Sequence, residues 1–168
     1  MVHPRIEQLR FARDEWRRAL DGVSPHDAVR RLGPMNCLSW IVGHLAWQEN
    51  RYWLFRAQGI NVAPQLDALV GYGAPASTPP LDQMWTAWHT VTKAADPFLD
   101  SLDNESLLLP ERINGVAQDY TVGSRVLRTT YHYWFHTGEI LAIRQMIGHA
   151  PLPEFVGDIE TEAPYRPE

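Results

Sequence analysis

Two histidines, His132 and His136, lie four residues apart in a segment with helical periodicity. This spacing puts both imidazoles on one face of a helix, about 6 Å apart along its axis. Two imidazoles placed in this way can share one metal ion. A third nitrogen from another helix would complete a site with open coordination positions, which is typical of a catalytic or ligand-accepting metal. His44, within Ser39–Ala46, is the candidate for the third ligand.

The residue after His132 separates this pair from a familiar protease motif. Zinc proteases of that type carry a glutamate directly after the first histidine as the general base, and here the position is Tyr133. Protease chemistry by that mechanism is therefore not expected. Histidine pairs of this spacing also occur in helix cores, so a purely structural role for His132 and His136 stays open.

Two polar residues are candidates for supporting the site. Gln48 follows His44 by four residues and so shares its helix face, where it could bind a ligand or water, or simply contact another helix. Glu139 follows His136 by three residues. It could orient an imidazole, as carboxylates behind metal ligands do, or form a salt bridge with Arg144.

The chain contains seven tryptophans. Most are expected to pack between helices. Trp40 and Trp134 are nearest to the histidines in sequence and could wall a pocket beside a metal, because ligand pockets favour aromatic linings. His89 is a further candidate for the pocket or the core. Since the first helix and its neighbours carry more tryptophan than a small core needs, we predict a homodimer whose interface covers part of it.

Four segments have the apolar periodicity of helices and predict an all-α fold, a four-helix bundle. They cover residues 6–20, 36–58, 81–102 and 122–148. Asn36 or Ser39 should cap the second helix, and Gly59 should end it. Pro97 should kink or split the third helix.

The connections between these helices also have recognisable patterns. Residues 60–80 are rich in proline and glycine and predict a long loop, which in a small domain is often functional. Residues 107–120 contain the pair Asn114-Gly115, which is typical of a tight turn. We therefore predict an extended segment with a turn here, which could form a small hairpin. Residues 155–168 form an irregular tail that should lie along the surface or fray. We treat residues 1–168 as one domain.

Composition excludes several classes of protein. The net charge of −5 argues against a nucleic-acid-binding surface. No apolar run approaches the ~20 residues that span a bilayer, so no membrane segment is expected. Cys37 is the only cysteine, which rules out an internal disulfide and fits a cytoplasmic protein. Its thiol is expected to behave as a small buried apolar group, not as a nucleophile.

The two histidine motifs resemble those of the DinB/YfiT-like superfamily. Ser39-Trp40-Ile41-Val42-Gly43-His44-Leu45-Ala46 resembles its second-helix motif, and His132-Tyr133-Trp134-Phe135-His136-Thr137-Gly138-Glu139-Ile140 resembles its late-helix motif. The resemblance implies a bundle of up-down-down-up type with a divalent metal on His44, His132 and His136. Three nitrogen ligands do not choose among zinc, nickel and iron, and we expect zinc or nickel. Members often form dimers. Glu139 stands where glutamine is common in the late motif.

Members of this superfamily include S-transferases that use bacillithiol or mycothiol, and a mycothiol-dependent maleylpyruvate isomerase. The resemblance therefore implies a metal-dependent enzyme that uses a low-molecular-weight thiol for transfer or isomerisation on a small electrophile. The alternative is a bundle that binds a metal or small ligand as a stress or sensor protein without turnover. The sequence does not separate these two hypotheses.

Overall fold

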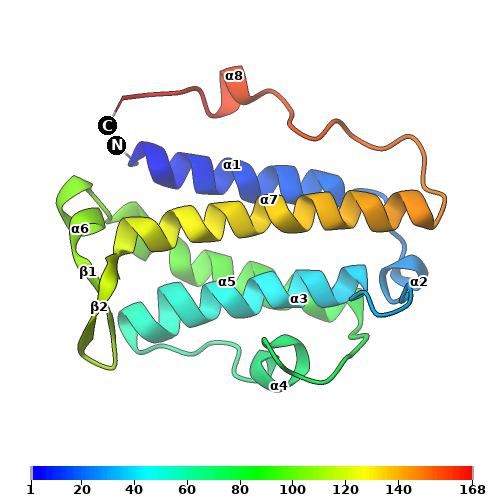
Figure 1. Cartoon of the computed structure of the whole chain (residues 1–168), viewed down its shortest axis with the longest axis horizontal. Helices are drawn as coiled ribbons and strands as arrows, with labels where there is room; N and C mark the ends of the chain where they lie inside the picture. The colour runs from blue at the N-terminus through cyan, green and yellow to red at the C-terminus, as the bar shows by residue number, and fades with distance from the viewer. Residues whose placement is uncertain (1, 168) are drawn as a thin grey trace. The chain divides into compact units, whose positions relative to one another are not determined.

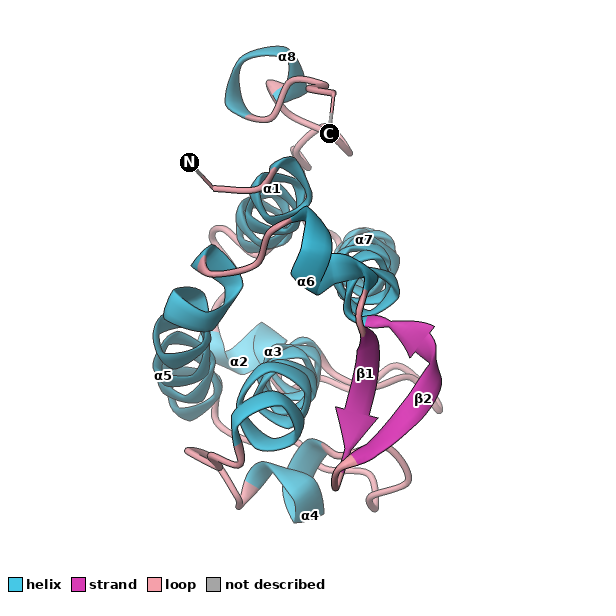
Figure 2. Ribbon diagram, turned by 90° about the vertical axis from the view of Figure 1, so that its left-hand side faces the viewer, coloured by secondary structure: helices cyan, strands magenta, loops and turns pink. Residues whose placement is uncertain are grey.

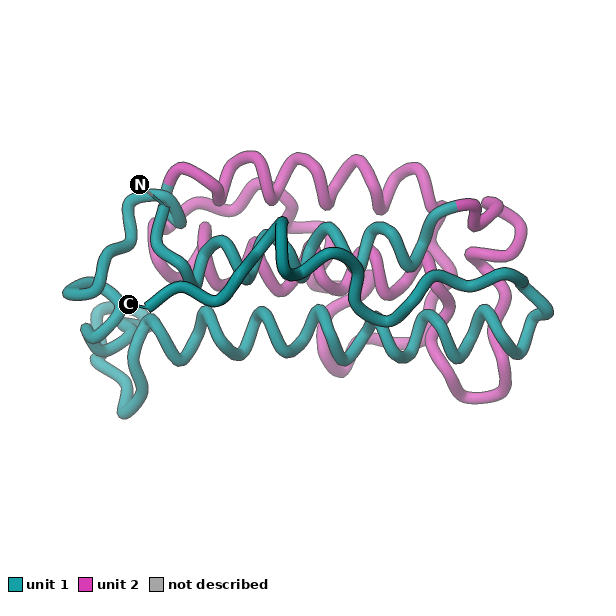
Figure 3. The backbone as a smooth tube through the Cα atoms, turned by 90° about the horizontal axis from the view of Figure 1, so that it is seen from above, with its two compact units in different colours: residues 1–21, 98–168 teal, residues 22–97 magenta. Residues whose placement is uncertain are grey.

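The computed structural model describes residues 2–167, which are mostly helical, as the sequence predicts. Two units can be distinguished by their internal contacts: residues 1–21 with 98–168, and residues 22–97 (Figure 3). They are called the first and second units below, and each is described by itself. The bundle arrangement of the four long helices stays a prediction. None of the described helices is long and apolar enough to cross a membrane.

The first unit is built on two helices, α1 (Pro4–Ala19) and α7 (Val122–Met146), which lie side by side (Figure 1). The ring of Trp16 in α1 meets Tyr133 of α7 edge-on, at 5.4 Å between ring centroids. His3 caps α1 by accepting a hydrogen bond from the Arg5 N–H, and Thr121 caps α7 in the same way. Both helices match their predicted ranges to within two residues.

A β-hairpin precedes α7, as predicted (Figure 2). Its strands are β1 (Pro110–Ile113) and β2 (Val116–Thr121). Asn114 and Gly115 both have positive φ, at 51° and 80°, which matches the turn that such a pair favours. The predicted extended piece began too early, because Leu107 and Leu108 end a short helix, α6 (Asn104–Leu108), capped by Asp103.

The tail is more ordered than predicted. It runs along α1 (Figure 1) and contains a one-turn helix, α8 (Ile159–Glu162), whose cap is Asp158. Hydrogen bonds attach it to α1: Glu15 accepts from the Gly157 N–H, and Gln8 donates to the Ala163 carbonyl at 2.6 Å. The tail therefore lies on the surface, as expected, but the described part is held at several points.

The second unit contains α2 (Pro25–Ala28), α3 (Leu38–Glu49), the π-helix η1 (Asn50–Arg56), α4 (Leu66–Val70) and most of α5 (Leu81–Asp100). The predicted second helix is thus α3 followed by η1. Its N-cap is Cys37, without a capping side chain, so neither Asn36 nor Ser39 caps it. Gly59 follows the helix with a φ of 70°, as predicted.

One other expectation for the second unit was wrong, and the expectation for Pro97 was wrong as to splitting the helix. The 60–80 connection is not a plain loop, because Leu66, Leu69 and Val70 have helical spacing and form α4, with Leu66 and Val70 fully buried. Pro97 does not split α5, which is continuous to Asp100. Proline lies in the last turn there, so its missing N–H removes only one hydrogen bond near the helix end.

Candidate metal centre

In the first unit, α7 brings His132 and His136 together as their spacing predicts. Their Nε2 atoms lie 3.0 Å apart. Two nitrogens that share one zinc ion at ~2.0–2.1 Å, with an angle between 90° and 110°, lie about 2.9–3.4 Å apart. The pair therefore has a separation suited to shared coordination. The His136 side chain is buried, whereas His132 is half-buried.

Glu139 contacts His136 and not the alternative partner, Arg144. Its Oε2 lies 2.7 Å from His136 Nδ1, while Arg144 donates to the Ala19 carbonyl at 2.6 Å and to His149 Nδ1 at 3.2 Å. A carboxylate only accepts, so His136 donates from Nδ1, and a neutral ring then carries no proton on Nε2. This arrangement leaves the Nε2 lone pair available, as metal coordination would require.

In the second unit, α3 carries His44 in a closely packed environment. The imidazole stacks between Trp40, at 4.5 Å between ring centroids, and Trp47, at 5.2 Å. Its Nδ1 lies 2.8 Å from the Val70 carbonyl oxygen. Because a carbonyl accepts, Nδ1 is the donor and Nε2 is the unprotonated nitrogen of the neutral ring. His44 thus has the same tautomer as His136, set by a different kind of partner.

The side chains of α4 and α5 approach a glycine in α3 closely. A Cβ atom at Gly43 would overlap Met84 Sδ of α5 and lie 3.1 Å from Val70 Cγ1 of α4, so a larger residue would make both side chains shift. The Trp47 indole N–H also donates to Asp67 of α4, at 2.5 Å. Sequence reasoning missed Asp67 and Val70. The signal was the helical apolar spacing within the 60–80 connection.

The remaining predicted site residues differ in burial and in the side chains that they contact. Gln48 is buried in α3, and Trp40 contacts His44. Trp134 contacts Phe11 of α1, at 6.1 Å between ring centroids. The aromatic neighbour of the histidine pair is instead Phe135, 5.0 Å from the His136 ring. The remaining candidate, His89, is exposed and stacks on Trp85, so it does not lie in the core.

The tryptophans mostly serve as packing residues, as expected. The buried ones are Trp16, Trp40, Trp47, Trp53 and Trp88, and the other two are half-buried. The aromatic surplus that motivated the homodimer is thus largely inside the chain. The homodimer stays a prediction, which sedimentation at micromolar concentration would test.

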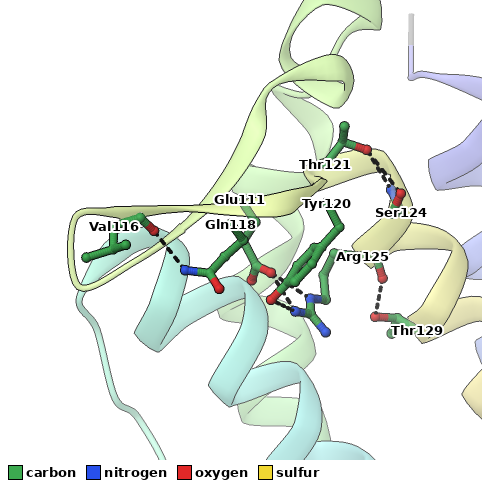
Figure 4. Close-up of polar contacts among 8 residues, drawn as sticks. All are labelled: Glu111, Val116, Gln118, Tyr120, Thr121, Ser124, Arg125 and Thr129. Atoms are coloured by element: carbon green, nitrogen blue, oxygen red, sulfur yellow. Dashed lines mark hydrogen bonds and ion pairs between the residues drawn. The ribbon is translucent and has the colours of Figure 1, made fainter.

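A buried ion pair stabilises the start of α7, and the sequence did not reveal it. The Arg125 guanidinium donates to Glu111 of β1 through Nε at 3.0 Å and Nη2 at 2.5 Å, and through Nη2 to the Tyr120 hydroxyl at 2.6 Å (Figure 4). Arg125 precedes His132 by seven residues and so lies on the same face of the helix. The pair fixes the hairpin to the helix that carries the two histidines.

Cys37 does not have the environment of a nucleophile. Its thiol is fully buried at the start of α3, with Sγ 3.3 Å from the Ser39 hydroxyl and 3.7 Å from the Ser77 carbonyl. A buried thiol with these neighbours behaves as a small apolar group, because reactive cysteines need exposure and nearby positive charge.

Comparison with known proteins agrees with the motifs. No curated protein matches the chain. A protein-family model described as mycothiol-S-transferase matches residues 6–148, which include most of α1, both histidine motifs and the hairpin. The chain therefore belongs to the mycothiol-S-transferase family, one of the DinB/YfiT-like families.

Proposed function

We propose that this protein is a metal-dependent S-transferase that joins the sulfur of mycothiol to a small electrophile. The observation that carries the proposal is the His132–His136 pair, with Nε2 atoms 3.0 Å apart and Glu139 behind one ring, in a chain of this family. His44 is proposed as the third ligand of one divalent ion, zinc or nickel. The donor set fits such an ion, because both oriented histidines present an unprotonated Nε2.

A divalent ion on three neutral imidazoles keeps its full charge and would lower the pKa of a bound thiol from its ordinary value near ~8.5. The chain's own residues hold and orient the ligands. Glu139 and the Val70 carbonyl fix two imidazole tautomers, and Trp40 and Trp47 hold the His44 ring in place. In the overall reaction the thiol sulfur bonds to the electrophilic carbon, the thiol proton goes to solvent, and the leaving group departs with its electron pair.

The test combines metal analysis with turnover. The wild-type chain, the triple variant His44→Ala/His132→Ala/His136→Ala, and the control His89→Ala are purified in parallel. We expect one ion per chain in wild type and control, and almost none in the triple variant with its helical content retained. Stoichiometric metal in a folded triple variant would refute the ligand assignment.

Turnover is then measured with 1-chloro-2,4-dinitrobenzene and, separately, mycothiol, bacillithiol or glutathione. We expect product only when both metal and thiol are present, with mycothiol as the preferred thiol. Cys37→Ser should keep this activity, because the sulfur comes from the added thiol. Bound metal without turnover on any electrophile would favour the alternative, a non-catalytic metal- or ligand-binding protein.

A further inference from the structure

The first unit contains a cavity of about 340 Å³ that the proposed reaction does not use. It lies among the start of α1, the first half of α7 and the tail that runs along α1 (Figure 1). Its volume is at the lower end of the range for small-molecule sites, about 300–1,000 Å³. The tail wall is held in place, because Gln8 donates to the Ala163 carbonyl at 2.6 Å and Ala163 is buried.

This cavity lies on the face of α7 away from the histidine pair. Tyr131 and Trp134 line it, and they share one stripe of the helix. Trp134 is two residues from both His132 and His136, which is a rotation of about 200° around the helix axis. A ligand in this cavity would therefore be separated from the pair by the helix itself.

The lining has a definite chemistry. Three aromatic side chains, Tyr131, Trp134 and Tyr165, provide flat apolar surface. Among the residues that the structure describes, the charged ones lining the cavity are Arg5 and Arg166, and none of these lining residues is acidic. Aromatic walls with guanidinium groups suit a planar ring that carries a carboxylate.

The Arg166 guanidinium is available to form an ion pair with a ligand, although it already has a partner. Its partner is Glu7, at 3.2 Å, and the two side chains are 50 % and 28 % exposed. An ion pair this open to solvent is weak, because water screens it and both side chains keep their freedom. A carboxylate entering the cavity would compete well for the guanidinium.

We propose that this cavity is a second ligand site, which binds a small planar aromatic carboxylate independently of the histidine pair. Tyr131 and Trp134 supply the stacking surface from α7, and Arg166 supplies the charge from the tail. The probe is 2-naphthoate, and its binding to the full chain is measured by calorimetry. We expect one equivalent to bind, with the same affinity before and after treatment with EDTA.

Variants test each part of the cavity. Trp134→Leu and Arg166→Gln should each weaken binding about tenfold, which corresponds to about 1.4 kcal/mol. Tyr165→Ala should also weaken it, and because Tyr165 is 90 % exposed this change cannot disturb the core. Phe135→Leu is the matched control on the same helix, since Phe135 is exposed but does not line the cavity, and it should bind as wild type.

Several results would overturn the proposal. They are absence of binding at millimolar probe, unchanged affinity in both Arg166→Gln and Tyr165→Ala, and equal affinity for the uncharged 2-naphthalenemethanol. Loss of binding after EDTA would place the probe at the metal instead. A change of sedimentation in Trp134→Leu without any probe binding would identify this face as a self-association surface, which also overturns the ligand site.

Discussion

The two units hold their histidines by different means. In the first unit, charged side chains dominate: Glu139 orients His136, and Glu111 with Arg125 anchors the start of the same helix. In the second unit, packing dominates: two tryptophan rings enclose His44, and a backbone carbonyl accepts its Nδ1–H. The same tautomer is thus reached once through a carboxylate and once through close packing.

Burial explains the difference. Every residue of α3 is buried, so a charged partner for His44 would have to lose its hydration. A backbone carbonyl carries no net charge and is brought close by α4. On α7 the buried positions form a stripe, and the Glu139 side chain at its edge is 21 % exposed, so its carboxyl group keeps part of its hydration.

The largest expected effect concerns the electrostatic anchor of the first unit. Glu111→Leu should destabilise the protein by about 3–5 kcal/mol, because it leaves the Arg125 charge buried without its carboxylate. The double variant Glu111→Leu/Arg125→Met should recover most of this loss. Urea unfolding measures both. A loss below ~1 kcal/mol would mean that packing, not charge, holds this helix.

The second prediction addresses packing in the second unit. Gly43→Ala should cost about 1–3 kcal/mol, because the new Cβ would overlap Met84 Sδ of α5 and crowd Val70 of α4, and both side chains would have to repack. Gly138→Ala in α7 is the matched control. Nothing lies within 4 Å of its new Cβ, so it should stabilise the helix by up to ~1 kcal/mol. Thermal unfolding measures the change in stability caused by each substitution. Equal changes in the two variants would show that close packing does not distinguish α3 of the second unit from α7 of the first.

The third prediction makes the two oriented histidines alike. Glu139→Gln replaces the carboxylate with a neutral carbonyl acceptor, the type that His44 already has. Metal affinity should fall by about tenfold, and in Glu139→Ala further, within a range of about 10–100-fold. Competition with a chromophoric chelator measures this, and Glu160→Gln in the tail is the control. Unchanged affinity in Glu139→Ala would show that orientation of His136 does not require the carboxylate.

The smallest expected effect is pH-dependent and involves the tail. The hydrogen bond from Arg18 lowers the pKa of Glu15, and the Gly157 N–H adds to this, although burial opposes it. Ionised Glu15 therefore stabilises the folded state above its ordinary pKa, and this contribution is lost as the pH falls through the lowered value. At pH 7 the free energy of unfolding of the wild type should exceed that of Glu15→Gln by about 1 kcal/mol.

The pH profile supplies the check on that assignment. The difference in unfolding free energy between wild type and Glu15→Gln should narrow as the solution is acidified below pH ~4. The protection of the Gly157 amide against hydrogen exchange, taken relative to its intrinsic exchange rate at each pH, should fall over the same range, because a protonated carboxyl is a weaker acceptor than a carboxylate. A difference that does not change with pH would assign the effect of the substitution to packing.

The sequence by itself determined the features that depend on short spacing. Apolar periodicity located α1 and α7 closely, Asn114-Gly115 located the hairpin turn, and helix geometry alone placed His132 beside His136. These three predictions succeeded because each feature depends on residues that are neighbours in the sequence.

Tertiary structure decided what the histidines contact. The acceptor for His44 is the carbonyl of Val70, which every residue type possesses, so no side-chain pattern could identify it. Trp134 faces Phe11 and not the pair, because α1 covers that side of α7. The same is true of Glu111, whose role depends on the hairpin folding back onto Arg125. Each of these three contacts depends on which backbone segments meet in space. The helical or strand periodicity of a sequence carries no information about which segments meet.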